Sequence, residues 1–161
     1  MYVSIRKGKK SDLAQVLSLI KELALYEKAP EEVSLTLKKF KKDFKSRHPL
    51  FHLLVAEEEQ AKSNSAIFGI ALYFYGYSTW KGKRIYLDDI VVTEKMRGKG
   101  IGKLLFDRLI KVAKKNKVKQ IMWQVLDWNE PAINFYKKYN AILDPEWITG
   151  KLNEGQIRKI K

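Results

Sequence analysis

A strand, a glycine-rich turn and a helix follow one another between positions 87 and 117, and this succession constrains the fold most. The apolar run Ile90–Val92 predicts a buried strand, the turn reads Arg97-x-x-Gly100-x-Gly102, and KLLFDRLIKVAKKNK predicts an amphipathic helix. Glycines let a backbone approach a ligand closely. The start of a helix presents unpaired N–H groups and the positive end of its dipole. The segment therefore predicts a phosphate cradle, with a pyrophosphate as its ligand, and the alternative is a tight turn without a ligand.

Two other phosphate-binding loops fit the residues less well. A Walker loop ends in Gly-Lys-Ser/Thr, whereas Gly102-Lys103 is followed by Leu104, which argues against a nucleoside triphosphatase. The dinucleotide fingerprint requires G-x-G-x-x-G, whereas Gly98, Gly100 and Gly102 give G-x-G-x-G directly after an arginine.

Composition bounds the remaining possibilities. A chain of 161 residues with 45% hydrophobic residues fits one globular domain. Without cysteine, a disulfide framework, a thiolate metal site and a cysteine nucleophile are excluded. No metal-ligand spacing occurs, so we expect no metal, and His48 and His52 are interpreted as structural. The first residues lack an apolar signal core and no run is long enough to span a membrane, so we expect a cytoplasmic protein with no membrane partner.

The net charge of +14 suggests a polyanionic partner. The cations are concentrated between Glu94 and Lys119, where only Glu94 and Asp107 oppose them. Part of this charge surrounds the glycine-rich turn, and we interpret the rest as a solvated helix face. Weak association with RNA stays an alternative, but no RNA-binding motif is present, so nucleic acid is not the partner that we expect.

Hydrophobic periodicity predicts strands alternating with helices in one α/β domain. Ser11-Asp12 is expected to cap the first helix, and Asn129 to cap a helix with Pro131 in its first turn. The helix after the glycine-rich turn should bury Ile101, Leu104, Leu105, Leu109, Val112 and Ala113. The predicted strands are 2–7, 51–56, 66–77, 84–92 and 120–126, a polar loop covers 57–65, and 147–160 is expected to form a terminal strand or hairpin.

Several segments carry a family resemblance. The turn Arg97-x-x-Gly-x-Gly after a buried strand resembles motif A of the GNAT superfamily of N-acetyltransferases. The segment 126–136, LDWNEPAINFY, resembles motif B of the spermidine/spermine-type acetyltransferases. Segments 20–27, 78–82 and 86–89 are similar to further family segments, in the family's order. Asn140-Ala141 stands where the family has Gly-Ala, a mild change because Asn also tolerates a left-handed helix end.

The resemblance implies the GNAT fold, an α/β (α+β) architecture whose mixed, mostly antiparallel central sheet is flanked by helices, as a single domain over 1–161. It implies a homodimer, with acetyl-CoA as co-substrate. It also implies transfer of the acetyl group to a primary amine of a small molecule, by direct attack in a ternary complex. The alternatives are an acetyltransferase of protein or peptide amines, and a basic nucleic-acid-associated protein that keeps the fold.

Site residues carry over from the matching motifs. Tyr136 corresponds to the general acid that protonates the CoA thiolate, and Asp88, beside Asp89, to a carboxylate that attracts the amine or accepts its proton. The residues implied to bind acetyl-CoA are Ile90, Val91, Val92, Arg97, Gly98, Lys99, Gly100, Ile101, Gly102, Lys103, Asn129, Glu130, Pro131 and Ala132. The residues implied to bind the substrate are Tyr26, Glu27, Asp88, Met122, Trp123 and Gln124.

Departures from the polyamine branch concern the choice of amine. The family usually has Glu at the position of Asp88, and the polyamine branch has Asp-Pro where this chain has Ser78-Thr79. Ser78-Thr79 and Leu126-Asp127 resemble instead the branch linked to thialysine Nε-acetylation. We therefore expect a thialysine- or lysine-like amine in preference to a polyamine, with the Ser78 and Thr79 hydroxyls receiving the carboxylate of such a substrate.

Overall fold

The computed structural model describes residues 2–45, 47–58 and 66–160. It divides into two compact units, Met1–Gln124 and Val125–Lys161, and each is described by itself. The prediction of one domain over 1–161 stays a prediction. Most of the loop predicted at 57–65 lies outside the described residues, and its first residues extend a strand.

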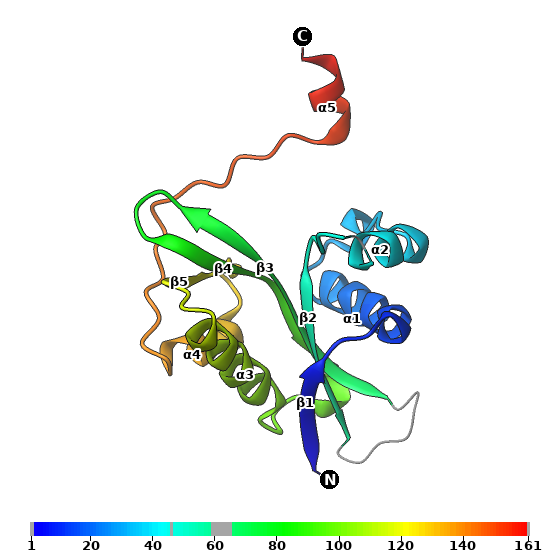
Figure 1. Ribbon diagram of the computed structural model, residues 1–161, viewed down its shortest axis with the longest axis vertical. Helices are drawn as coiled ribbons and strands as arrows, with labels where there is room; N and C mark the ends of the chain where they lie inside the picture. The colour runs from blue at the N-terminus through cyan, green and yellow to red at the C-terminus, as the bar shows by residue number, and fades with distance from the viewer. Residues whose placement is uncertain (1, 46, 59–65, 161) are drawn as a thin grey trace. The chain divides into compact units, whose positions relative to one another are not determined.

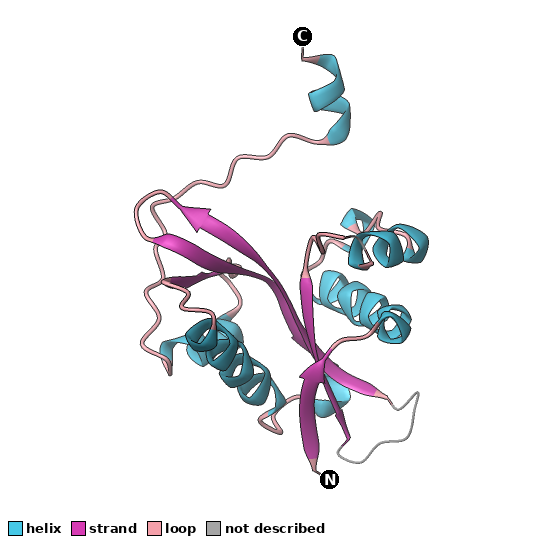
Figure 2. Cartoon of the chain, viewed as in Figure 1, coloured by secondary structure: helices cyan, strands magenta, loops and turns pink. Residues whose placement is uncertain are grey.

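The first unit is built on a sheet whose described strands follow the order β1-β2-β3-β4-β5 (Figures 1 and 2). The strands are β1 (Val3–Lys7), β2 (His52–Glu58), β3 (Ile67–Ser78), β4 (Gly82–Val92) and β5 (Gln120–Met122). Neighbours from β1 to β4 are antiparallel, and β5 runs parallel to β4. The predicted mixed, mostly antiparallel sheet is therefore confirmed. The strand predicted over 120–126 is shorter, because the ladder between β4 and β5 covers only Arg84–Tyr86.

Helices cover both faces of the sheet in this unit (Figure 1). The helices are α1 (Leu13–Tyr26), α2 (Leu37–Phe44) and α3 (Ile101–Lys115), and Thr36 caps α2 by accepting a hydrogen bond from the Lys39 amide. The core between α1, α2 and one face of the sheet includes Leu13, Val16, Phe40, Val55 and Ile70. None of the helices described is long and apolar enough to cross a membrane.

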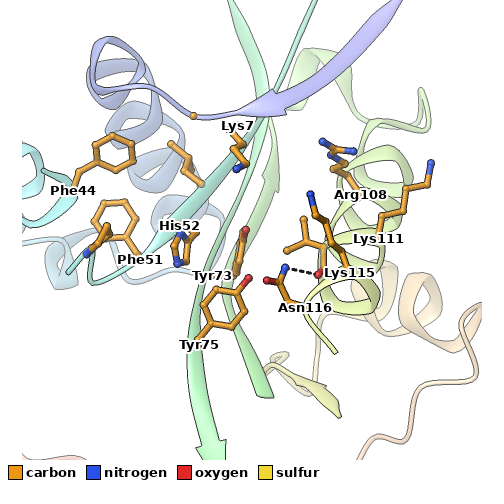
Figure 3. A pocket seen from close by; sticks show the side chains of 14 residues that line it. Lys7, Phe44, Phe51, His52, Tyr73, Tyr75, Arg108, Lys111, Lys115 and Asn116 are labelled. Atoms are coloured by element: carbon orange, nitrogen blue, oxygen red, sulfur yellow. Dashed lines mark hydrogen bonds between the residues drawn. The ribbon is translucent and has the colours of Figure 1, made fainter. Parts of the chain in front are cut away.

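Helix α3 packs on the opposite face. Its buried residues are Ile101, Leu105, Phe106, Leu109 and Ala113. The prediction that Leu104 is buried is wrong, since 42% of it is exposed. At the C-terminal half of the helix, Arg108 and Lys111 lie across from the rings of Tyr73 and Tyr75 on β3 (Figure 3).

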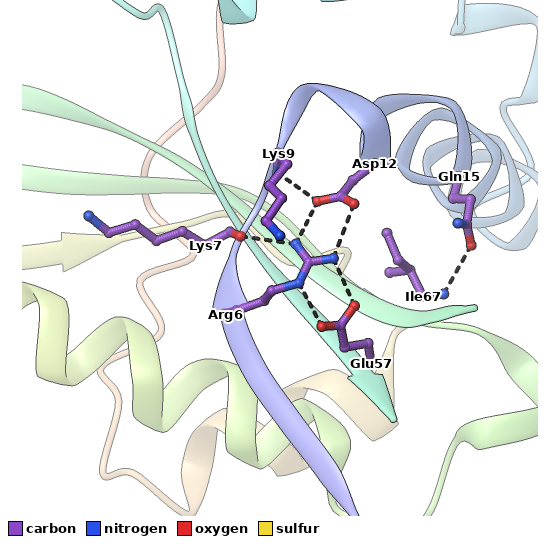
Figure 4. Close-up of polar contacts among 7 residues, drawn as sticks. All are labelled: Arg6, Lys7, Lys9, Asp12, Gln15, Glu57 and Ile67. Atoms are coloured by element: carbon purple, nitrogen blue, oxygen red, sulfur yellow. Dashed lines mark hydrogen bonds and ion pairs between the residues drawn. The ribbon is translucent and has the colours of Figure 1, made fainter. Parts of the chain in front are cut away.

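A partly buried ion-pair network fixes the start of α1 (Figure 4). Arg6 on β1 donates to both carboxylate oxygens of Asp12, at 2.7 and 3.1 Å, and to both of Glu57, at 2.7 Å each. The Lys9 amide also donates to Asp12, at 2.6 Å. Burial alone would raise the pKa of Asp12, but the hydrogen bonds from Arg6 and Lys9 outweigh it and lower the pKa. The prediction that Ser11-Asp12 caps α1 is wrong in its detail, because the Asp12 carboxylate faces Arg6 and Lys9 and makes no cap bond to α1.

The second unit contains α4 (Glu130–Lys137) and α5 (Glu154–Lys159). Asn129 caps α4 by accepting a hydrogen bond from the Ala132 amide at 3.3 Å, as predicted, and Pro131 lies in the first turn. The terminal strand or hairpin expected at 147–160 is wrong, because its last part is helical. Asn153 and Gln156 form a capping box, an arrangement that favours a helix start.

Candidate active site

The glycine-rich turn has the backbone that a phosphate cradle requires. Gly98 and Gly100 adopt φ angles of +73° and +78°, which side chains of other L-residues rarely tolerate. Gly100 is the N-cap of α3, so the first amides of the helix follow it directly. A Cβ placed on either glycine would meet no heavy atom within 4 Å. The turn therefore presents its backbone to open space at a helix start, and its donors suit an anionic group such as a pyrophosphate.

A carboxylate on α1 holds the start of this turn. Glu22 accepts hydrogen bonds from the Glu94 amide at 2.7 Å and from the Thr93 hydroxyl at 3.1 Å. Its Oε1 also lies 3.7 Å from Nη2 of Arg97. Glu22 was not among the predicted site residues. Its place just before the predicted substrate residues 26 and 27 was the one signal in the sequence that could have indicated a role in the site.

The predicted cofactor residue Arg97 is engaged within the chain. Its Nε donates to the Val92 carbonyl at 3.0 Å, and its guanidinium lies 4.9 Å from the centre of the Tyr26 ring. Two neighbouring cations also have partners. Lys103 pairs with Asp107 at 2.6 Å, and Lys99 lies 3.5 Å from the Met96 sulfur. The cradle is thus lined chiefly by backbone, with Arg97 linking it to the predicted substrate residue Tyr26.

A β-bulge places two carboxyl groups near the middle of β4. Leu72 pairs with Asp89 and Tyr73 pairs with Leu87, so Asp88 is the extra residue of the bulge. Bulges redirect side chains and occur often beside active sites. Asp88 reaches the surface, whereas Asp89 is partly covered. The backbone of β4 is therefore irregular at the predicted residue Asp88 and at its neighbour Asp89.

The pKa values of these carboxyl groups are raised. Burial raises the pKa of Asp89 most, the negative charges of Asp88 and Glu27 raise it further, and the result is about 7. Burial also raises the pKa values of Asp88 and Glu27. Because the charge of Glu27 acts on Asp89, the end of α1 and the bulge form one acidic cluster. A carboxyl group with a pKa near 7 suits proton transfer at neutral pH, and the sequence analysis had given the role to Asp88.

The predicted substrate residues Met122, Trp123 and Gln124 stand at the end of β5 and just after it. The Tyr86 hydroxyl donates to Oε1 of Gln124 at 3.2 Å, and Nη1 of Arg84 lies 3.6 Å from the Met122 sulfur. The Trp123 ring packs edge-on against Phe106, with 5.6 Å between ring centres. Beyond Tyr86, the ladder with β5 ends, and the segment from Leu87 onward has no β5 partner within the described ranges.

The acidic cluster and the cradle lie at opposite ends of this segment, which pairs with β3 along one edge and has no β5 partner along the other. From Asp88 to Val92 the strand advances about 13 Å, and the turn that leads to Gly98 and Gly100 follows immediately. The backbone of Ile90–Val92 lies between them. The arrangement therefore suits an elongated cofactor, whose phosphate end lies at the turn and whose reactive end lies beside Asp88 and Asp89.

The remaining predicted residues belong to the second unit. Asn129, Glu130, Pro131 and Ala132 form the cap and first turn of α4. Tyr136 lies two turns into α4, is only 4% exposed, and has its ring 5.1 Å from that of Phe135. Burial raises the pKa of its hydroxyl, so the group stays protonated at neutral pH, as a proton donor must.

The predicted determinant of substrate choice lies away from the bulge. The Ser78 hydroxyl accepts hydrogen bonds from the Trp80 and Lys81 amides, at 3.3 and 3.2 Å, in the turn between β3 and β4. Along β3, Ser78 is about 17 Å from Tyr73, the residue that flanks the bulge. Within one chain, Ser78 therefore does not lie beside the acidic cluster, and its hydroxyl already completes a hairpin turn.

Comparisons with known proteins agree with this geometry. Residues 14–141 match the model of the Acetyltransferase (GNAT) family. The thialysine N-epsilon-acetyltransferase of Mus musculus is 38% identical over 162 residues, covering 97% of this chain and 95% of its own. The enzyme of the same name from Bos taurus is 38% identical over 143 residues, covering 87% and 84%.

A solved structure shows the same fold. It is an integron cassette protein from V. cholerae, with a TM-score of 0.76, 22% identity, and coverage of 99% of this chain and 97% of its own. GNAT acetyltransferases use acetyl-CoA as co-substrate. The match of the family model over most of the chain, together with relatives of this identity and coverage, shows that the chain belongs to the GNAT family and is an N-acetyltransferase.

Proposed function

We propose that this chain transfers the acetyl group of acetyl-CoA to the primary amine of a small, lysine-like molecule of the thialysine class. The observation that carries the proposal is the course of β4. Beyond Tyr86 this strand keeps its pairing with β3 but has no β5 partner, and this segment has the acidic cluster of Asp88, Asp89 and Glu27 at one end and the cradle of Gly98 and Gly100 at the other.

The cofactor is proposed to bind along this segment. The amides of the cradle and of the first turn of α3 would hold the pyrophosphate, and the exposed edge of Ile90–Val92 would pair with the extended arm, as an added strand pairs with a sheet edge. Asn129–Ala132 complete the set by resemblance to motif B. Bound acetyl-CoA would supply the acetyl group as an activated thioester.

The amine must lose a proton before or during its attack. A lysine-like ammonium has a pKa near 10.4, and the negative charges of Glu27 and Asp88 would attract it to the bulge. Asp89 or Asp88 would then accept its proton, directly or through water. The amine nitrogen forms the new bond to the acetyl carbon as the carbon–sulfur bond breaks. Tyr136 would give its proton to the departing thiolate, and backbone amides of β4 would stabilise the developing oxyanion.

The choice of amine is supported by the relatives rather than by Ser78. The two relatives described above carry the name thialysine N-epsilon-acetyltransferase, and the carboxyl groups of Asp88 and Glu27, whose charges act on Asp89, suit one ammonium group. A polyamine carries further cations, spaced along its length, and would require acidic groups farther from the bulge. We therefore propose thialysine and related amino-acid amines as the better substrates.

We also propose a homodimer. The C-terminal segment after α4 exposes apolar side chains, including Ile142 at 93%, Trp147 at 74% and Ile148 at 97%. Apolar surface that is exposed in one chain is often covered by another protein, and a second copy is the partner that the family resemblance implies. Light scattering that gives the mass of one chain would contradict this proposal.

One experiment tests the function. CoA release from acetyl-CoA is measured with thialysine, lysine, ornithine, spermidine and a lysine-containing peptide at matched concentrations. We expect the highest kcat/KM for thialysine. Turnover only with the peptide would replace the small-molecule proposal by protein acetylation, and absence of turnover with every amine would contradict the proposed activity.

A further inference from the structure

A cavity lies beside the C-terminal half of α3, away from the proposed active site (Figure 3). Its volume is about 530 Å³, within the range of small-molecule sites. It opens between the end of β1, the start of β2 with the residues just before it, the middle of β3, Phe44 at the end of α2 and the C-terminal half of α3. From Gly100 to Lys111 the helix advances about 17 Å, so the cavity and the cradle are separate.

The lining of the cavity is strongly cationic. It includes Lys7, Arg108, Lys111 and Lys115, and no aspartate or glutamate. None of these four cations belongs to an ion pair among the described residues. Unlike Lys103, which Asp107 neutralises on the same helix, they leave the charge of the cavity uncompensated.

Folding brings these four positive charges close together, and their mutual repulsion destabilises the folded chain. Arg108, Lys111 and Lys115 are spaced three and four residues apart, so they share one face of α3 and repel one another. The helix dipole favours Lys115 in the last turn. It does not account for Lys7, which arrives from β1, nor for the absence of acidic side chains from the lining. A bound anion would offset the repulsion.

Aromatic rings form the opposite wall. His52 stacks on Tyr73 with 5.4 Å between ring centres, and meets Tyr75 edge-on at 5.1 Å. Burial raises the pKa of Tyr73 to about 12, so its hydroxyl remains a hydrogen-bond donor at neutral pH. Nζ of Lys83 lies 4.7 Å from the centre of the Tyr75 ring and adds a further positive charge nearby. Tyr73 is only 5% exposed, so the wall offers chiefly the partly exposed rings of His52 and Tyr75 opposite the cations of α3.

We propose that this cavity binds a small organic phosphate with several negative charges and a planar ring, that is, a nucleoside polyphosphate. The cations of α3 and Lys7 hold the phosphates, and the wall of His52, Tyr73 and Tyr75 contacts the ring, since aromatic side chains bind the faces of bases. The volume exceeds what inorganic phosphate needs. Binding at this cavity leaves the cradle of Gly98 and Gly100 available to the co-substrate.

The test uses ATP as the probe, measured by calorimetry at low salt on the full chain carrying Gly100→Val, so that the cradle does not contribute. CoA is left out because it is itself a nucleotide with several phosphates and would compete for the cavity, and the variants below are made in the Gly100→Val chain. Lys111→Glu and Lys7→Glu each place a negative charge in the cavity from a different element. The matched control is Lys114→Glu, an exposed lysine of the same helix that does not line the cavity.

We expect Lys111→Glu and Lys7→Glu each to weaken ATP binding by about tenfold to a hundredfold, the scale of one lost hydrogen bond to a charged group. Lys114→Glu should stay close to the Gly100→Val chain itself, and tripolyphosphate, which lacks the ring, should bind more weakly than ATP. Equal losses in Lys111→Glu and Lys114→Glu would overturn the proposal, because binding would then follow net charge alone. Absence of ATP binding, or binding of a short single-stranded RNA in its place, would also overturn it.

Discussion

The raised pKa of Asp89 makes a quantitative prediction about stability. The value rises from its usual 3.8 to about 7 in the folded chain. These values differ by about 3, and each pKa unit corresponds to about 1.4 kcal/mol, so ionising Asp89 in the folded chain costs about 4 kcal/mol. Part of this cost comes from repulsion by Asp88 and Glu27, which salt screens. The figure therefore applies at low ionic strength.

The sign follows from proton binding. Between about pH 4 and pH 7 the folded chain keeps the proton on Asp89, whereas the unfolded chain has released it, so the folded chain binds more protons. The contribution of this group to stability is complete below the unfolded pKa and is lost as the pH rises through about 7. Asp89→Asn removes this dependence. The variant should match the unmodified chain near pH 4 and exceed its unfolding free energy by about 4 kcal/mol above about pH 8.

Urea unfolding of both chains over this pH range measures the difference, in which the contributions of carboxyl groups that do not interact with Asp89 cancel. Asp88→Asn serves as the control, since it removes one neighbouring charge but leaves Asp89 buried. Its stability should therefore still fall with pH, over a smaller range. A difference between Asp89→Asn and the unmodified chain that is the same at acidic and at alkaline pH would refute the reasoning. A stabilised Asp89→Asn chain that no longer turns over amines would show that the buried carboxyl group is kept for its chemistry.

Three further perturbations test other parts of the structure. Gly100→Val places a β-branched residue at φ +78° in the cradle. CoA affinity measured by calorimetry should therefore be lost while circular dichroism shows an intact fold, and unchanged affinity would contradict the proposal that the cradle binds the cofactor. Tyr136→Phe removes the proposed proton donor and should lower kcat about 10²–10⁴-fold with CoA affinity retained; near-normal turnover assigns Tyr136 to packing. Arg6→Met leaves Asp12 and Glu57 without their cation and should cost about 1.5–3 kcal/mol in urea unfolding, the scale of a lost hydrogen bond to a charged group. Lys10→Met, an exposed control in the same turn, should cost little.

Much of the fold could be predicted because its elements have local causes. The pattern of apolar residues predicts β1 to β4. The predicted cap at Asn129 acts within one turn of its helix, as does the cap at Thr36, which was not predicted. The terminal helix α5 was missed although its capping residues, Asn153 and Gln156, are also local. There the scattered apolar residues of 147–160 favoured the prediction of a strand, whereas the capping box favours the helix that the structure shows.

The details of the site depended on contacts between distant segments. Asp12 looked like a helix cap, but Arg6 approaches it from β1 and is itself bound by Glu57 of β2. A charged partner binds a carboxylate more strongly than a helix amide does. The pKa of Asp89 depends on burial in the β4 bulge and on Glu27 of α1, and neither can be read from the positions of two adjacent aspartates. The family resemblance that made Ser78 a candidate substrate contact likewise could not show that its hydroxyl completes a hairpin turn.

Glu22 connects the two halves of the proposed site, and this gives the fold a functional consequence. Its carboxylate receives the Glu94 amide and the Thr93 hydroxyl, so the chain leaving β4 is fixed to α1 four residues before Tyr26. Arg97 reinforces the link from the other side, since its guanidinium lies over the Tyr26 ring. Any shift of the cradle would therefore move the end of α1, where Glu27 contributes to the acidic cluster. If CoA orders the turn, it should order the amine site through the same contacts, and the co-substrate would then bind before the amine.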